Sequence, residues 1–271
     1  MIFFTSFNTP SRRLPVLHLS MVVAIGLLSC LVARVSAQTA TPPSAQTTAL
    51  QTTANPPLMD NKVFVHVLFD QFEGRTNGSD SEFRWDGQAW AGTDMNKLWL
   101  KSEGFVNDGE MSDGDHEALY DRPIPRMRYF DAQAGIRADL DSGPKRVWGA
   151  VGIEGLAPHF FQLEPTFYFR DGGHLAARVS GSYDLLLTQR LVAQPELEMN
   201  FYSKQDPERG IGTGLSDVDT GIRLRYEFSR KFAPYVGFAC DGTFGSTATF
   251  ARQSGESVAN PRFVFGVRLW Y

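Results

Sequence analysis

The chain has 271 residues, of which 26 are basic and 30 acidic, so its formal net charge at pH 7 is −4. An acidic surface disfavours nucleic acid as a partner and favours cations. Of the two cysteines, Cys30 lies in the apolar N-terminal stretch described next, and Cys240 alone cannot form an internal disulfide once that stretch is removed.

The first 37 residues have the pattern of a cleaved export signal. Arg12 and Arg13 precede an apolar run, and Val35-Ser36-Ala37 fits a small-x-small cleavage site. Two other interpretations remain open. Ser11-Arg12-Arg13 resembles a twin-arginine signal, and Leu27-Leu28-Ser29-Cys30 resembles a lipoprotein cleavage box.

Cleavage after Ala37 should leave a mature chain in two parts. Residues 38–58 consist mainly of Thr, Pro, Ala and Gln, a composition that predicts a disordered leader. Residues 59–271 form the second part, which we expect to be a single domain. The mature chain carries 23 basic and 30 acidic residues, a formal charge of −7.

The last ten residues give the clearest structural signal. Apolar residues occupy every second position, so in a strand they share one face; they are Phe263, Phe265, Val267, Leu269 and Tyr271. Such a strand with a final aromatic residue is typical of outer-membrane β-barrels. After an export signal, it predicts a bacterial outer-membrane protein.

Earlier segments repeat this alternation, with turn residues between them. In residues 189–202, for example, Leu197 and Met199 alternate with Glu196 and Glu198. We therefore predict an all-β protein, an antiparallel transmembrane β-barrel of about twelve strands, with ten as the alternative. The predicted strands are 62–73, 82–91, 96–106, 129–140, 145–156, 159–170, 174–186, 189–202, 218–229, 232–242, 245–252 and 262–271.

The alternation has a physical reason. In lipid, every backbone donor and acceptor must be paired within the protein, so a closed sheet can span whereas an open one cannot. Apolar side chains then face lipid and charged side chains face the lumen. A soluble sandwich would reverse this arrangement.

We expect an interior ladder of ion pairs, or alternatively a polar path for ions, from Glu103, Arg190, Glu196, Glu198, Arg223 and Arg225. The five tryptophans predict aromatic girdles at the membrane interfaces.

Nine sequence strings carry a family resemblance. They are residues 59–61, 68–73, 98–104, 152–158, 183–191, 194–198, 221–227, 232–237 and 266–271. Through them the chain resembles the copper resistance protein B family. The resemblance implies an outer-membrane barrel without enzymatic activity, which binds copper ions or helps to export them. Its implied partners are copper, outer-membrane lipid and periplasmic copper-resistance proteins. Family members often have a Met- and His-rich segment before the barrel, but residues 38–57 contain neither residue type.

Candidate copper ligands are scattered along the mature chain. Thioether sulfur suits copper(I) and imidazole suits copper(II). The densest group is a predicted acidic loop, residues 108–117, which contains Met111 and His116. His66 lies on the polar face of the first strand. The other candidates are Met59 and Met95, which we expect near strand ends facing the periplasm, and His159 in a predicted loop. Met127 is expected at the opposite rim.

Two other functions remain open. The first is a structural or adhesive barrel that binds another macromolecule through its outer loops, and it predicts no metal phenotype. An outer-membrane hydrolase built from dispersed residues is the second alternative. The sequence contains no Gly-x-Ser-x-Gly elbow, nucleotide-binding loop or His-Glu-x-x-His motif that would support an enzyme.

Overall fold

The computed structural model describes residues 62–78, 80–107, 109–141 and 143–271. The predicted signal (1–37), the predicted leader (38–58) and Met59 lie outside the described residues. Their assignments stay predictions.

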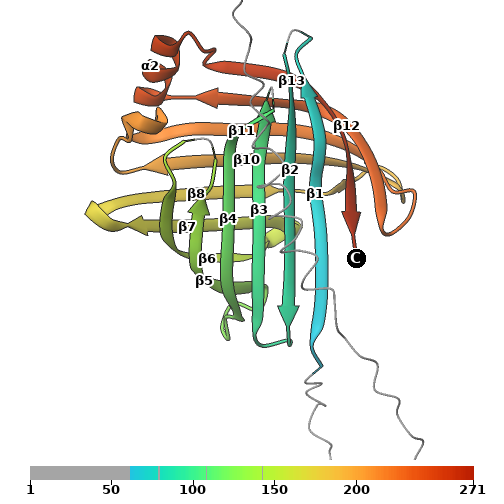
Figure 1. The fold of residues 1–271 in the computed structure, drawn as a ribbon. Helices are drawn as coiled ribbons and strands as arrows, with labels where there is room; N and C mark the ends of the chain where they lie inside the picture. The colour runs from blue at the N-terminus through green and yellow to red at the C-terminus, as the bar shows by residue number, and fades with distance from the viewer. Residues whose placement is uncertain (1–61, 79, 108, 142) are drawn as a thin grey trace, which may run out of the picture.

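The described part of the chain folds into a single antiparallel sheet that closes on itself (Figure 1). Its strands are β1 (Phe64–Thr76), β2 (Ser81–Gly92), β3 (Lys97–Asn107), β4 (Glu110–Pro123), β5 (Phe130–Asp139), β6 (Arg146–Ala157), β7 (Phe161–Arg170), β8 (His174–Ser182), β9 (Leu185–Leu186), β10 (Leu191–Tyr202), β11 (Gly214–Tyr226), β12 (Phe232–Thr243) and β13 (Ala259–Trp270). The two-residue β9 follows β8 and pairs with β10 beyond it. Since β8 and β9 occupy one position in the wall, the barrel has twelve strands, as predicted.

The barrel closes between its first and last strands. Phe69 pairs with Leu269 and Thr76 with Phe263. Tyr271 extends this seam, because its backbone N–H donates to the Val67 carbonyl at 2.8 Å and its carbonyl accepts from the Val67 N–H at 3.0 Å. The predicted terminal strand is thereby confirmed, and it closes the ring of backbone hydrogen bonds.

The distribution of side chains is that of a membrane barrel. Large apolar residues on the outer wall are exposed, such as Val151 at 50% and Phe167 at 65%. Charged residues inside are buried, such as Glu73 and Arg75 at 0%. This arrangement suits lipid outside and a polar lumen. It confirms the predicted direction of the two faces.

A β-bulge in β1 shifts the alternation. The register with β2 slips between Phe69 and Gln71. Before the slip, Leu68 faces the lumen; after it, Gln71, Glu73 and Arg75 are the buried positions. One extra residue thus turns odd-numbered side chains inward, as bulges do, and this shift was not predicted.

Two elements differ from the prediction: one strand was not predicted, and one predicted strand is a helix. Residues 110–123, interpreted as an acidic loop at their start, form the strand β4. Residues 245–252, predicted as a strand, belong to the helix α2 (Gly245–Ser254). The missed strand β4 and the extra predicted strand 245–252 cancel in the count. The predicted number of strands was therefore right, although two of the assignments were not.

The helix α2 packs against the barrel at one end (Figure 1). Its buried residues Thr247, Ala248 and Ala251 share one helical face. The Thr247 hydroxyl accepts from the Gly212 N–H at 2.8 Å and lies 2.9 Å from the Ser216 hydroxyl of β11. Gly255, with φ of +79°, ends the helix in the left-handed conformation that glycine favours. Among the described residues, no helix is both long and apolar enough to cross a membrane.

Alternate connections lie at the same end of the barrel, and we name the two ends accordingly. The terminus end contains Tyr271 and the turns 93–96, 124–129, 158–160 (η1, Pro158–Phe160), 187–190 and 227–231. The loop end contains residues 77–78 and 80, residue 109, residues 140–141 and 143–145, and the connections 171–173 (η2, Asp171–Gly173), 203–213 with η3 (Pro207–Arg209), and 244–258 with α2. The two longest connections, 203–213 and 244–258, are both at the loop end.

Candidate functional site: the charged lumen

Buried ion pairs from distant strands fill one side of the lumen. Arg75 contacts Glu73 at 2.8 Å, Asp241 at 3.0 Å and Asp219 at 3.2 Å. Arg223 donates to both oxygens of Glu73, at 2.9 Å each. Buried charges are tolerated only when they are paired in this way. The predicted ladder of interior ion pairs is therefore present, in the form of a connected network.

A second group of ion pairs crosses the lumen through Arg178 of β8. Its guanidinium pairs with Glu103 of β3, with Asp115 of β4 at 2.5 Å and with Glu198 of β10 at 3.2 Å. In the order of strands around the barrel, five strand positions separate β3 from β10 in either direction. Arg178 therefore links opposite walls. We call Arg178 and these three carboxylates the Arg178 cluster.

The Arg178 cluster lies next to the buried aromatic ring of Tyr168. The Tyr168 ring lies 5.9 Å from the Arg178 guanidinium carbon and 4.8 Å from that of Arg137. Arg137 also pairs with Asp115, at 2.7 Å. The Tyr168 hydroxyl donates to Glu117 at 2.6 Å. These contacts fix the two arginines side by side in the middle of the barrel.

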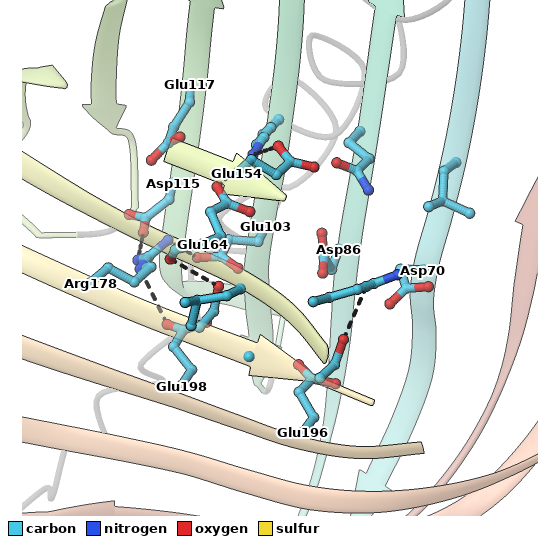
Figure 2. Close-up of a pocket in the computed structure, with 18 of the residues that line it drawn as sticks. Asp70, Asp86, Glu103, Asp115, Glu117, Glu154, Glu164, Arg178, Glu196 and Glu198 are labelled. Carbon is cyan, nitrogen blue, oxygen red and sulfur yellow. Dashed lines mark hydrogen bonds and ion pairs between the residues drawn. The ribbon is translucent and has the colours of Figure 1, made fainter. Parts of the chain in front are cut away.

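On the terminus side of this cluster lies a cavity of about 350 Å³. Figure 2 shows the carboxylates of Asp70, Asp86 and Glu196 on one side of it and the Arg178 cluster on the other. Its lining contains nine carboxylates but three cations, Lys101, Arg178 and Arg268. Lys101 pairs with Glu154 at 2.9 Å and with Glu164 at 2.5 Å. The cavity, which we call the acidic chamber, carries an excess of negative charge.

A second cavity, of about 370 Å³, lies toward the loop end. Its lining is balanced, with five carboxylates and five Lys or Arg side chains. At its rim, Arg146 donates to Asp206 at 3.1 Å and to Glu208 at 2.8 Å. Burial tends to raise the pKa of Asp206, but hydrogen bonds and charge from Arg146 hold that pKa below its ordinary value. We call this cavity the loop-side chamber.

Three of the five tryptophans lie inside the barrel and therefore do not belong to the predicted girdles. Trp148 is buried inside, where its indole N–H donates to Asp139 at 2.9 Å. Trp90 and Trp99 lie with ring centroids 6.1 Å apart, near the amines of Lys97 and Lys101. Only an interior position brings these rings beside lumenal lysines. They serve as cation–π partners of buried charges.

His66 lies on the lumenal face of β1 at the terminus end. Its ring centroid is 5.6 Å from that of Trp270 and 6.0 Å from that of Trp90. Trp270 is 42% exposed, so this aromatic recess opens to solvent at the mouth of the barrel. An imidazole in that position is accessible to ions that enter from the terminus end.

His116 has a different position from the predicted acidic loop. It lies within β4, between Asp115 and Glu117, both of which are buried in the lumen. Its own side chain therefore points to the outer face. There its Nδ1 lies 3.0 Å from the Ser102 hydroxyl, which also accepts from the Trp85 indole at 3.1 Å.

Met111 also lies on the outer face of β4, near the loop end. It pairs with Val106 across a register shift. A Cβ placed at Gly114 would collide with the Met111 sulfur, so the methionine side chain covers this glycine. Met111 and His116 thus share the outer wall and do not contribute to the lumen.

The remaining candidates lie at the terminus end. Met95 is 42% exposed in the turn 93–96, and His159 is exposed in η1 with φ of +70°. Met127 lies in the turn 124–129, at the same end as Met95. Its predicted place at the opposite rim was wrong, because the unrecognised strand β4 brings the chain back to the terminus end before β5 begins.

Two arginines differ from the predicted interior set: Arg178 lies in the lumen but was not predicted there, and Arg190 was predicted there but lies outside it. Arg178 was not singled out, although Ala176, Arg178 and Ser180 alternate with apolar neighbours in a way that indicates a lumenal face. Arg190, predicted for the interior ladder, is exposed in the turn before β10.

Within the described residues, no three His, Cys, Asp or Glu side chains converge as a preformed metal site.

Comparison with known families agrees with this architecture. The sequence model of the copper resistance protein B precursor family (CopB) matches residues 63–271, which is the whole barrel. The chain belongs to the copper resistance protein B family. Two relatives in this family are each 39% identical over 212 residues, covering 78% of this chain and 71% of the relative. They are copper resistance protein B of Escherichia coli and a copper resistance protein B homolog of Pseudomonas syringae pv. tomato.

Solved porins are also similar in outline to this copper resistance protein B family barrel. The KdgM porin is 12% identical with a TM-score of 0.43, covering 75% of this chain and 98% of the porin. The NanC porin is 11% identical with a TM-score of 0.48, covering 76% and 99%. With its lipid-facing apolar wall, this member of the family is located in the bacterial outer membrane.

Proposed function

We propose that this protein binds copper ions at the outer membrane and contributes to copper resistance, through copper homeostasis or export. The observation that carries the proposal is its membership of the copper resistance protein B family, with relatives of that name 39% identical to it. The proposed role is non-enzymatic.

The barrel geometry supports a direction for this role. Outer-membrane barrels have short periplasmic turns and longer extracellular loops. The longest connections here are at the loop end, so the terminus end faces the periplasm. Copper in the periplasm then meets Met95, His159 and the His66 recess first, and periplasmic copper-resistance proteins are the partners we propose at this end.

The candidate ligands are suited to both oxidation states of copper. Imidazoles of His66, His116 and His159 suit copper(II), and thioethers of Met59, Met95 and Met111 suit copper(I). We propose His66 as the ligand that belongs to the lumen, because it is the one histidine of this set on the lumenal face of a described strand and beside the mouth.

A deletion strain tests the role in resistance. Loss of the gene should lower the copper concentration at which growth stops, and plasmid-borne wild-type protein should restore it. Zinc and nickel tolerance, measured in parallel, controls for a damaged outer membrane. Unchanged copper tolerance would contradict the proposal and favour a structural or adhesive role, which deletion of the extracellular loops would then test.

A copper titration of the purified barrel tests the ligands. His66→Phe should lose about one equivalent of bound copper(II) per chain, because an imidazole is a main source of affinity in such sites. The measurement is metal content after dialysis, with circular dichroism to check the fold. The double variant Met111→Leu/His116→Phe, on the outer wall, serves as the comparison. If it loses copper whereas His66→Phe does not, the site belongs to the outer face of β4.

A further inference from the structure

Beyond copper binding, we infer that the lumen is a path for small cations that the Arg178 cluster holds closed. The first observation is that the two chambers lie in series. The acidic chamber is lined by terminus-side residues such as Leu156 and Ser182, and the loop-side chamber by residues such as Lys204 and Arg209. Among the described residues, only Arg178 lines both.

The second observation is that Arg178 is held across the path. Its side chain is 14% exposed, and its ion pairs reach β3, β4 and β10. Asn200 of β10 accepts a further hydrogen bond from its Nε at 3.1 Å. A side chain tied to opposite walls blocks the passage between the chambers, and Tyr168 fixes its plane from one side.

The third observation is the charge of the acidic chamber. Carboxylates exceed cations there by nine to three. Among them, Asp86 of β2 faces the same space as Asp70 and Glu196 (Figure 2). In a low-dielectric enclosure such an excess attracts cations and repels anions. Removing Arg178 would both widen the path and make this chamber more negative.

Conductance across a planar bilayer tests the inference with potassium chloride alone, independently of copper. Arg178→Ala should raise the single-channel conductance of the barrel at least about threefold over wild type, with a reversal potential in a salt gradient that shows preference for K⁺ over Cl⁻. The matched control is Arg225→Ala, which removes another ion-paired arginine, more deeply buried than Arg178, that lines neither chamber. It should leave the conductance at the wild-type level.

Arg178→Ala leaves carboxylates without a cation. If this variant does not fold, the double variant Arg178→Ala/Glu103→Gln takes its place. Heat-dependent migration on gels shows which variants are folded barrels. A folded variant with wild-type conductance, or one that prefers Cl⁻, would overturn the inference. Either result would leave copper binding and copper tolerance unaffected, so the two proposals fail separately.

Discussion

Replacing Arg75 with methionine should lower the free energy of unfolding by about 3–5 kcal/mol, which is the usual cost of removing one partner from a buried ion pair. Arg75 is fully buried and contacts Glu73, Asp219 and Asp241. Methionine fills much of the same volume but leaves these carboxylates short of a cation. The measurement is a urea titration of the barrel folded in lipid vesicles, followed by tryptophan fluorescence.

Arg126→Met is the control for this prediction, since Arg126 is exposed in the turn 124–129. It should unfold at the same urea concentration as the wild-type protein. The double variant Glu73→Gln/Arg75→Met should recover part of the lost stability, because it removes one carboxylate together with the cation that paired with it. A loss below about 1 kcal/mol in Arg75→Met would mean that water or other arginines replace the guanidinium.

Replacing Val151 with arginine should destabilise the barrel by about 2–4 kcal/mol, the range for a basic residue near the centre of the lipid-facing wall. Val151 is 50% exposed in the middle of β6, and its neighbours Ala150 and Gly152 are buried. On a soluble protein this change at an exposed site would be harmless. In hydrocarbon the guanidinium must be dehydrated or must reach the interface.

The matched control for Val151→Arg is Val63→Arg. Val63 is 66% exposed and precedes β1 at the terminus end, where the wall meets water. There the same change should cost about 1 kcal/mol or less. Both variants are compared by urea titration in vesicles. Equal behaviour of the two would show that the apolar wall is not embedded in lipid, and the outer-membrane assignment would fail.

The two-residue alternation of apolar and polar residues was sufficient to predict most strands of the barrel wall. Residues 129–140 and 189–202 were predicted as strands and correspond to β5 and β10. Two-residue periodicity is a property of the strand itself, so it can be read without knowing the neighbours. The direction of the faces was also predictable, because an export signal and a terminal aromatic residue indicate lipid outside.

Local composition was misleading at β4 and α2. The segment from Gly109 to Glu117 is rich in acids and glycine, which is typical of loops. In the barrel, Asp115 is stabilised by Arg137 and Arg178, which come from β5 and β8. Residues 245–252 contain Thr, Phe and Ala, which predict a strand, but they lie in the helix α2, where Thr247 contacts Gly212 and Ser216.

The sequence by itself determined that this chain is an alternating, all-β protein of the copper resistance protein B type, because periodicity and family motifs are local and linear. The tertiary structure alone decided which charges meet. Arg178 reaches Glu103 and Asp115 from 75 and 63 residues away in the chain. Such pairings depend on ring closure and on the β1 bulge, and neither leaves a periodic trace in the sequence. The closed lumen, its two chambers and the arginine between them are therefore properties of the assembled barrel.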